Sequence, residues 1–303
     1  MEADETGTLA RLKTHRIELI DPAIAKNRGR IIKTTGDGLL VEFHSVVEAV
    51  LCAAEIQRRM AKRNSDVAPA RWMQFRIGIN LGDVIVDGNE GLILDPGGHK
   101  VYSKVLAATM SALGPAKLRH IFLSHQDPDI VAAVNGWLMT TDAIAHVSKL
   151  WVRFVPHFGL DRLVQDRLLG IPDEGARLKL GSRDLLILPA HFLHSCGNFH
   201  VYDPASKILY TGDLGASIGV AGREVSDFAA HVPAMEGFHR RYMQGNRALR
   251  AWAKMARTLD VEIIAPQHGL LFRGKDMVHQ FYDWCEQLSC GIDVMEHMYQ
   301  VPA

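Results

Sequence analysis

The sequence has 303 residues, 48% of them hydrophobic and 22% charged, so it is long enough for two domains with a sizeable core. Its 34 Lys and Arg balance its 34 Asp and Glu, which excludes bulk charge as a basis for binding nucleic acid or a membrane. The four Cys form no CxxC pair, the N-terminus is acidic and polar, and no apolar run reaches the roughly 18 residues of a membrane span. We therefore expect a soluble, cytoplasmic protein.

Residues 5–64 are predicted to form a helix, two strands and a second helix. The stretch GTLARLKTHRIELIDPAIAKNRG has apolar residues at helical spacing. RIIKTTGDGLLVEF contains two β-rich runs around a Gly-Asp-Gly turn, which is typical of a hairpin. SVVEAVLCAAEIQRRMAKRN predicts an amphipathic helix with Ser45 as its N-cap, and MQFRIGINLGDVIVDG predicts two further strands.

These stretches resemble the catalytic domain of class III adenylate/guanylate cyclases over roughly residues 5–88. The resemblance implies that residues 1–88 are a truncated cyclase-like segment, a partial ferredoxin-like α+β module. It also implies that Lys33 recognises a purine and that Asp37 is a metal ligand. The chain begins after the family's first metal-binding Asp and departs before its later Asn and Arg. Cyclase chemistry needs two carboxylates for its metal pair, so we expect no cyclase activity and interpret Asp37 as a turn residue.

From residue 89 to residue 303 the pattern changes to strands that alternate with helices. The strand-like runs are followed by His or Asp and then by a turn residue, as in KLRHIFLSHQDPD, DLLILPAHFLHSCGNFHVYD, KILYTGDLG and VEIIAPQHG. This pattern is typical of an α/β fold whose active site lies at the strand ends.

The stretch LSHQDPDIVA places His125, Asp127 and Asp129 at alternate positions directly after an apolar run. In an extended chain, alternate side chains point to the same side, and carboxylates that converge there require a cation. Three further residues follow later strands: His194, Asp213 and His268. Six imidazole and carboxylate ligands without Cys favour two metals that share one bridging carboxylate.

The order and spacing of these residues resemble the metallo-β-lactamase fold over roughly residues 89–295, so we expect an α/β protein with an αββα sandwich. The first cluster of that fold is usually HxHxDH, whereas here Asp127 replaces the second His and Ile130 the last. With the acidic Asp127 at this position, the cluster resembles the di-iron branch of the fold, which contains the flavodiiron and the oxygen-binding di-iron proteins. The resemblance implies two Fe as cofactors. An added oxygen ligand also favours iron or manganese over zinc, and two Zn remain the alternative.

The resemblance implies a non-haem di-iron protein that binds O₂, or reduces O₂ or NO. His125, Asp127 and His194 would hold one iron, Asp129 and His268 the other, and Asp213 would bridge. The sequence contains neither a flavodoxin-like phosphate loop nor a rubredoxin CxxC pair. Electrons would then come from a separate reductase, unless the protein senses its ligand without turnover. We expect a homodimer. Two alternatives stay open: a di-zinc hydrolase of an ester, lactam or thioester, and a gas-sensing signalling module.

Several residues near the predicted ligands have less direct interpretations. His191 competes with His194, and we favour His194 because the following SCGN occupies the place of the family's turn. Asp95 is interpreted as a structural hydrogen-bonding residue and Cys196 as a small buried residue. The other nearby imidazoles are interpreted as outer-layer or surface residues: His200, His231 and His239.

Overall fold

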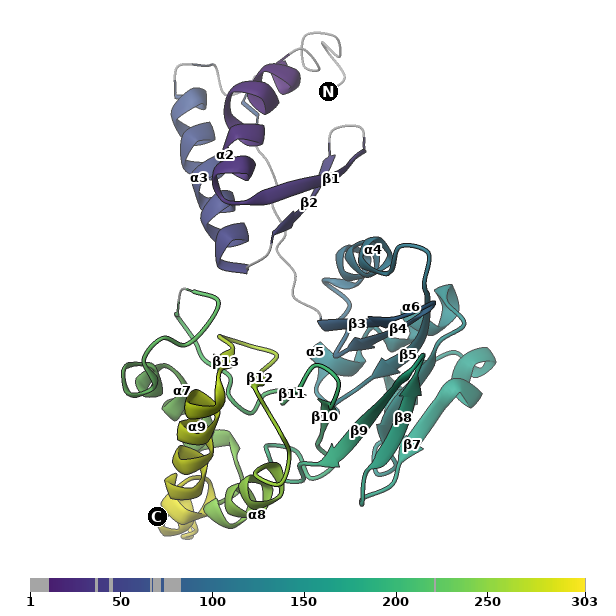
Figure 1. The fold of residues 1–303 in the computed structure, drawn as a ribbon, viewed down its shortest axis with the longest axis vertical. Coiled ribbons are helices and arrows are strands. Elements are labelled where there is room, and N and C mark those ends of the chain that lie inside the picture. The colour runs from purple at the N-terminus through teal and green to yellow at the C-terminus, as the bar shows by residue number, and fades with distance from the viewer. Residues whose placement is uncertain are drawn as a thin grey trace. The chain divides into compact units, whose positions relative to one another are not determined.

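The computed structural model in Figure 1 describes residues 11–35, 38–43, 46–65, 67, 72–73, 83–220 and 222–302. The chain divides into two compact units, residues 1–80 and residues 81–303. The sequence pattern predicts this division after residue 88. The division falls earlier because β3 (Asp83–Asp87) pairs antiparallel with β4 (Glu90–Leu94) and so belongs to a sheet of the second unit.

The first unit contains the helix, hairpin and helix that its sequence predicts. A π-helical segment η1 (Arg16–Ile20) leads into α2 (Asp21–Lys26). The strands β1 (Gly29–Thr35) and β2 (Gly38–Phe43) pair antiparallel, and α3 (Val46–Asn64) follows them. Apolar side chains from the helices form its core: Leu19, Ile20, Ala23, Ile24, Cys52, Ile56 and Met60.

Part of the cyclase-like pattern lies outside the described residues. This applies to the hairpin turn with Asp37, to the N-cap Ser45 and to the strand expected at residues 74–80. Lys33 lies in β1, but its side chain is outside the described part of the chain. The cyclase-like roles of Lys33 and Asp37 therefore stay predictions.

The second unit contains two sheets that pack face to face. The five-stranded sheet has the order β3-β4-β5-β6-β7 and the six-stranded sheet the order β13-β12-β11-β10-β9-β8. Their remaining strands are β5 (Lys117–Phe122), β6 (Ile144–Ser148), β7 (Leu168–Ile171), β8 (Ala176–Leu180), β9 (Arg183–Pro189), β10 (Phe199–Asp203), β11 (Ile208–Tyr210), β12 (Ile263–Ala265) and β13 (Phe272–Arg273). Leu92 and Phe122 from one sheet and Leu185 and Val201 from the other share the apolar layer between them.

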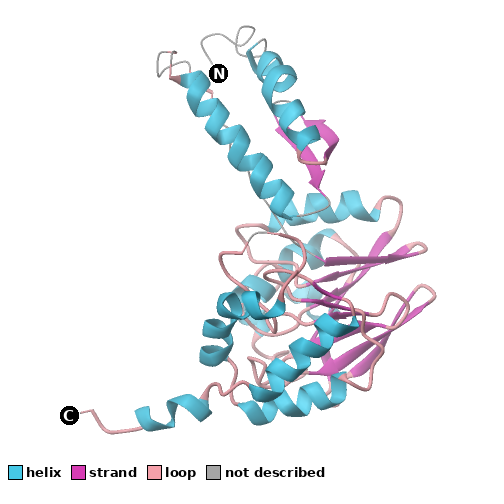
Figure 2. Ribbon diagram, turned by 60° about the vertical axis from the view of Figure 1, so that its left-hand side comes forward, coloured by secondary structure: helices cyan, strands magenta, loops and turns pink. Residues whose placement is uncertain are grey.

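Helices cover the outer faces of the two sheets (Figure 2). The helical segments are α4 (Tyr102–Leu113), α5 (Pro128–Val131), α6 (Val134–Thr140), η3 (Val155–Phe158), η4 (Arg162–Arg167), α7 (Phe228–Tyr242), α8 (Asn246–Ala256), α9 (Lys275–Gln287), α10 (Ile292–Met295) and η5 (Glu296–Met298). Trp137 of α6 is buried with Ile121 of the five-stranded sheet, and Phe281 of α9 with Ile264 of the six-stranded sheet. This arrangement confirms the expected αββα sandwich.

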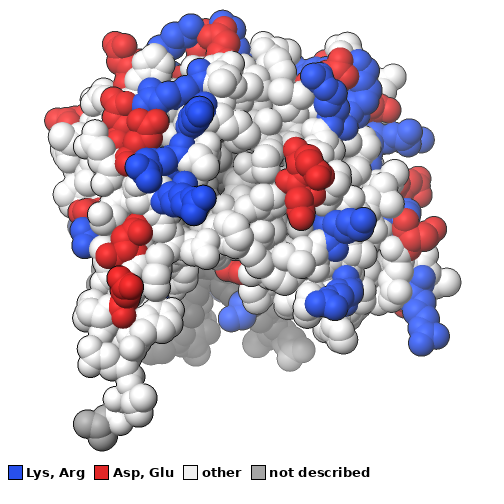
Figure 3. Space-filling view, turned by 90° about the horizontal axis from the view of Figure 1, so that it is seen from below, with Lys and Arg blue, Asp and Glu red and all other residues white. Residues whose placement is uncertain are grey.

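Charged side chains of both signs are mixed on the face of the molecule in Figure 3. On the face in Figure 3, acidic and basic residues lie near one another, without one dominant sign. This mixture agrees with the balanced charge of the sequence. Among the described residues, no helix has both the length and the apolar character needed to cross a bilayer.

Strand direction decides where the polar residues gather. Strand β10 is antiparallel to both β9 and β11, and β11 is parallel to β12. The strands β9, β11 and β12 therefore run in the same direction, and their carboxyl ends lie at one edge of the six-stranded sheet. The loops that leave this edge carry His194, Asp213 and His268, so the topology itself places these side chains together.

Candidate metal centre

His125 is the most deeply buried of the predicted ligands. It follows β5 and is only 1% exposed. Its Nδ1 lies 2.8 Å from the hydroxyl of Ser124, whose backbone N–H donates a 2.7 Å hydrogen bond to Oδ1 of Asp95. Its Nε2 is buried and has no hydrogen-bond partner among the described residues. A buried nitrogen without a partner is costly unless a ligand takes up its lone pair or its proton.

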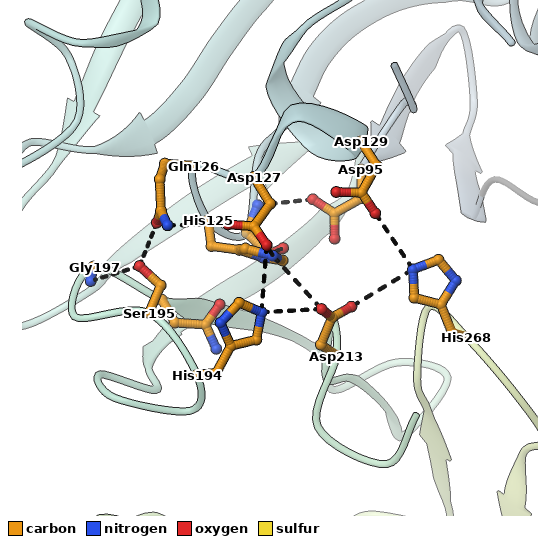
Figure 4. A network of polar contacts seen from close by, with 12 residues as sticks. Asp95, His125, Gln126, Asp127, Asp129, His194, Ser195, Gly197, Asp213 and His268 are labelled. Carbon is orange, nitrogen blue, oxygen red and sulfur yellow. Dashed lines mark hydrogen bonds and ion pairs between the residues drawn. The ribbon is translucent and has the colours of Figure 1, made fainter. Parts of the chain in front are cut away.

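Three further side chains converge beside this nitrogen and form a first group of ligand candidates with His125 (Figure 4). They are those of Asp127, His194 and Asp213. Ligand atoms of His125, His194 and Asp213 all lie within 4.8 Å of one another. Oδ2 of Asp213 is 3.1 Å from Nε2 of His194 and 3.7 Å from Nε2 of His125. Oδ2 of Asp127 is 3.7 Å from the same two imidazole nitrogens. Two imidazoles and two carboxylate oxygens thus surround one point, as a metal requires.

A second group lies on the other side of the Asp213 carboxylate. Nε2 of His268 is 3.7 Å from Oδ1 of Asp213 and 3.6 Å from Oδ2 of Asp129. Oδ1 of Asp213 is buried and has no hydrogen-bond partner in the described part of the chain. The structure therefore brings all six predicted residues together and places Asp213 between the two groups.

The loops are shaped to allow this approach. Gly212, directly before Asp213, has a φ of +50°, a conformation that favours glycine. A Cβ at this position would lie 3.2 Å from the Ser124 hydroxyl oxygen. The backbone N–H of Gln267 donates a 2.7 Å hydrogen bond to the Gly212 carbonyl, so the loops of Asp213 and His268 are tied together.

The electrostatics of the site favour a positive charge. Burial lowers the pKa of His125, but the nearby carboxylates of Asp127, Asp213 and Asp95 outweigh it and raise that pKa. The Asp129 carboxylate, 3.6 Å from its Nε2, raises the pKa of His268. Burial raises the pKa of Asp213, but the hydrogen bond from His194 and the nearby histidines hold it below its usual value. All three shifts show that positive charge is favoured among these carboxylates. Either bound protons or metal ions can supply that charge.

Residues that are not ligand candidates also shape the site. Gln126 and Ser195 link the loop that follows β5 to the loop that follows β9. Asn198 donates a hydrogen bond to the carbonyl of Leu193, directly before His194. Sequence reasoning missed all three, because a single amide or hydroxyl beside a ligand carries no pattern of its own. Asp95 has the hydrogen-bonding role that was expected, since it accepts from Ser124.

The remaining candidates lie apart from the two groups or face elsewhere. His191 Nε2 is 2.8 Å from the carbonyl of Asp173, whereas His194 faces Asp213. Cys196 is exposed, so the prediction that it is buried was wrong. Ile130 is fully buried in the apolar cluster beneath the five-stranded sheet. The histidines placed in an outer layer or at the surface are all buried: His200, His231 and His239.

The αββα sandwich and the imidazole–carboxylate groups define a metallo-β-lactamase-fold protein with room for a pair of metals. The model of one family, described as ODP family beta lactamase, matches residues 82–269. The chain belongs to this family.

Two solved structures are similar to this chain. The structure described as "Peroxy diiron species of chemotaxis sensor ODP" is 38% identical, with a TM-score of 0.64, and the match covers 71% of this chain and 90% of that one. The flavodiiron protein from Giardia intestinalis is 20% identical, with a TM-score of 0.57, over 67% of this chain and 50% of that one. The second likeness supports the fold alone.

The first unit has a different relative. The protein described as "Putative adenylate cyclase 3" of Rhizobium meliloti (strain 1021) is 43% identical over 90 residues. The match covers 30% of this chain and 15% of the relative. The expected resemblance to adenylate cyclases over a short N-terminal part is therefore confirmed.

Proposed function

We propose that this protein is a non-haem di-iron protein that binds O₂. One observation carries the proposal: the two oxygens of Asp213 face two separate groups of imidazole and carboxylate ligands. A carboxylate in this position can bridge two metals. The 38% identical relative supports iron, because its structure is described as a di-iron species of a chemotaxis sensor.

We assign the metal ligands from the geometry of the two groups. His125, Asp127, His194 and Oδ2 of Asp213 would hold one iron, and Asp129, His268 and Oδ1 of Asp213 the other. The orphaned Nε2 of His125 and Oδ1 of Asp213 fit this assignment, because each would gain a partner. Three carboxylates and three imidazoles favour iron over a thiolate-seeking metal.

When bound, the iron pair would supply the open coordination and the electrons that O₂ binding requires. The surrounding residues hold the ligands in place. Ser124 and Asp95 fix the orientation of the His125 ring. The rings of Phe238 and Tyr242, from α7, pack edge-on against His194 at centroid distances of 6.1 and 5.7 Å. At position 130 a buried isoleucine replaces a ligand, so the second iron would have fewer protein donors than the first.

We favour a sensing role over turnover, because the 38% identical relative is described as a chemotaxis sensor. Reduction of O₂ or NO would require electrons from a separate reductase. A homodimer in the cytoplasm is part of the same proposal. The cyclase-like segment, expected at residues 1–88, would then be a passive or regulatory module.

Metal analysis combined with absorption spectroscopy tests the proposal. The protein should be reconstituted anaerobically with Fe²⁺, analysed for iron and then exposed to O₂. We expect about two irons per chain and a visible absorption band that forms on addition of O₂. The variant Asp213→Ala, compared with the exposed control Asp142→Ala, should lose that band. A colourless protein that retains zinc and cleaves esters would overturn the proposal in favour of a di-zinc hydrolase.

A further inference from the structure

Gln126 separates two of the proposed ligands in the sequence, and its side chain lies beside the first group (Figure 4). Its Nε2 donates a 3.0 Å hydrogen bond to Oδ1 of Asp127. Its Oε1 accepts a hydrogen bond from the hydroxyl of Ser195, the residue directly after His194. One amide therefore contacts the side chains of Asp127 and Ser195, on two of the loops that carry ligands of the first group.

The chemistry of these groups fixes the direction of each hydrogen bond. An ionised carboxylate only accepts, so the NH₂ of Gln126 must face Asp127 and its carbonyl oxygen must face Ser195. The Ser195 hydroxyl must then donate, which leaves its oxygen to accept from the backbone N–H of Gly197 at 3.4 Å. The result is a chain of three hydrogen bonds, each donating toward Asp127.

Ser195 is held in place by its own loop. It is 6% exposed, and its carbonyl accepts hydrogen bonds from the backbone N–H groups of Phe192 and Asn198 at 2.6 and 3.3 Å. The position of Ser195 is therefore fixed by its loop. Gln126 bonds to Ser195 and to Asp127, so it holds the Asp127 carboxylate relative to that loop. Fixed outer partners of this kind orient metal ligands.

The hydrogen bond from Gln126 gives the two oxygens of Asp127 different partners. Oδ1 is occupied by Gln126, while Oδ2 points between the Nε2 atoms of His125 and His194 at 3.7 Å from each. Asp129 in the second group differs, since its side chain is 60% exposed and its ion-pair partner among the described residues is His268. The hydrogen bond from the Gln126 amide therefore supports a carboxylate of the first group and not the Asp129 carboxylate of the second.

We infer that Gln126 and Ser195 are positioning residues that leave Asp127 a single oxygen for the metal of the first group. This inference rests on the proposed function. Without the amide, the Asp127 carboxylate is free to rotate, so both its oxygens compete for the metal and its position is less well defined. The pair also couples the loop of His125 to that of His194, so the two loops meet the metal as one preorganised unit.

The test compares Gln126→Leu, Ser195→Ala and the double variant with the parent protein. Gln280→Leu is the matched control, because Gln280 is exposed on α9, where its amide donates to the Asp276 carbonyl. Fe²⁺ and Co²⁺ are titrated separately into metal-free protein under anaerobic conditions, and two binding constants are fitted. The visible absorption of bound Co²⁺ reports the coordination geometry, and thermal unfolding of the metal-free variants reports the fold.

We expect Gln126→Leu to weaken one of the two binding constants about tenfold and to change the Co²⁺ spectrum, because outer partners of ligands typically contribute tenfold or more. The other constant should stay within about twofold, as should both constants of Gln280→Leu. Ser195→Ala should weaken the same constant less. The double variant should match Gln126→Leu, because Ser195 acts through Gln126.

Several outcomes would overturn the inference. These are parent-like constants in Gln126→Leu, equal weakening of both constants, and effects of the two substitutions that add fully. If Gln126→Leu does not fold, Ser195→Ala decides, since parent-like constants and spectrum in that variant reject the coupling. Failure of the proposed function is a separate result: the parent itself would then fail to bind two metal ions.

Discussion

Oδ1 of Asp213 lies 3.7 Å from Nε2 of His268, on the side of the carboxylate opposite His194. The same carboxylate approaches His194 through Oδ2 at 3.1 Å. A side chain that reaches two separate groups links their occupancy, because it contributes to both metal positions. This relationship is the basis of the first prediction.

Asp213→Ala should lose both irons, whereas His268→Ala should retain about one per chain. A bridging carboxylate neutralises two cations that lie roughly 3.5–4 Å apart, and without it only solvent or hydroxide separates them. Removal of His268 takes away a ligand of the second iron only, so the first iron should stay bound. The measurement is the iron content of the two purified variants, with circular dichroism to show that each is folded. If folded Asp213→Ala keeps two irons, the bridge has been assigned to the wrong residue.

Asp127→His should shift the metal preference from iron toward zinc. The substitution restores the HxH spacing of the hydrolase cluster and replaces a hard oxygen with an imidazole nitrogen. It also removes the acceptor of the Gln126 hydrogen bond. Competition between Fe²⁺ and Zn²⁺, followed by metal analysis, should show a lower ratio of iron to zinc than in the parent. An unchanged ratio would count against the role of Asp127.

The protein should form no cyclic nucleotide from ATP or GTP with Mg²⁺ or Mn²⁺. The cyclase-like segment retains Lys33 and Asp37 but lacks a second metal-binding carboxylate in its matching stretches. The measurement is chromatography of the reaction mixture against a reference cyclase. Cyclic nucleotide that disappears in Asp37→Ala would show that this segment is active.

The metal-free protein should lose stability as the pH falls from 7 to 5, partly through His239. Its Nε2 accepts a 2.8 Å hydrogen bond from the backbone N–H of Gly215, and its Nδ1 lies 2.7 Å from the Met235 carbonyl, so the ring is neutral. Burial lowers the pKa of His239 to about 4, from 6.5. Because the folded pKa is depressed, the unfolded chain binds the proton more tightly. The stability is present above pH 6.5 and is lost as the pH falls toward 4.

The His239 contribution between pH 7 and pH 5 should be about 2 kcal/mol, from a shift of this size. The variant His239→Gln should therefore show a shallower decline in the free energy of unfolding, measured with urea at the two pH values. His297→Gln, at an exposed position, is the matched control and should decline like the parent. Parallel declines in His239→Gln and the parent would show that another group is responsible.

Local sequence patterns are enough to predict the alternation of strands and helices and the residue types at the site, and the αββα sandwich follows from the resemblance to the metallo-β-lactamase fold. Apolar runs that end in His or Asp predict strands with polar residues at their carboxyl ends, and this signal needs no distant part of the chain. The six ligand candidates, from His125 to His268, could therefore be predicted from the sequence, since each lies in the segment that follows a strand-like run. The fold brings all six together.

The relation of these side chains to one another depends on contacts between distant segments. The pairing of β3 with β4 places the start of the second unit before residue 88. The different partners of the two Asp213 oxygens depend on loops that leave β9, β11 and β12 at one sheet edge. The role of Gln126 depends on Ser195, which lies 69 residues away in the sequence. No local pattern relates such segments, because chain folding alone sets the distance between them.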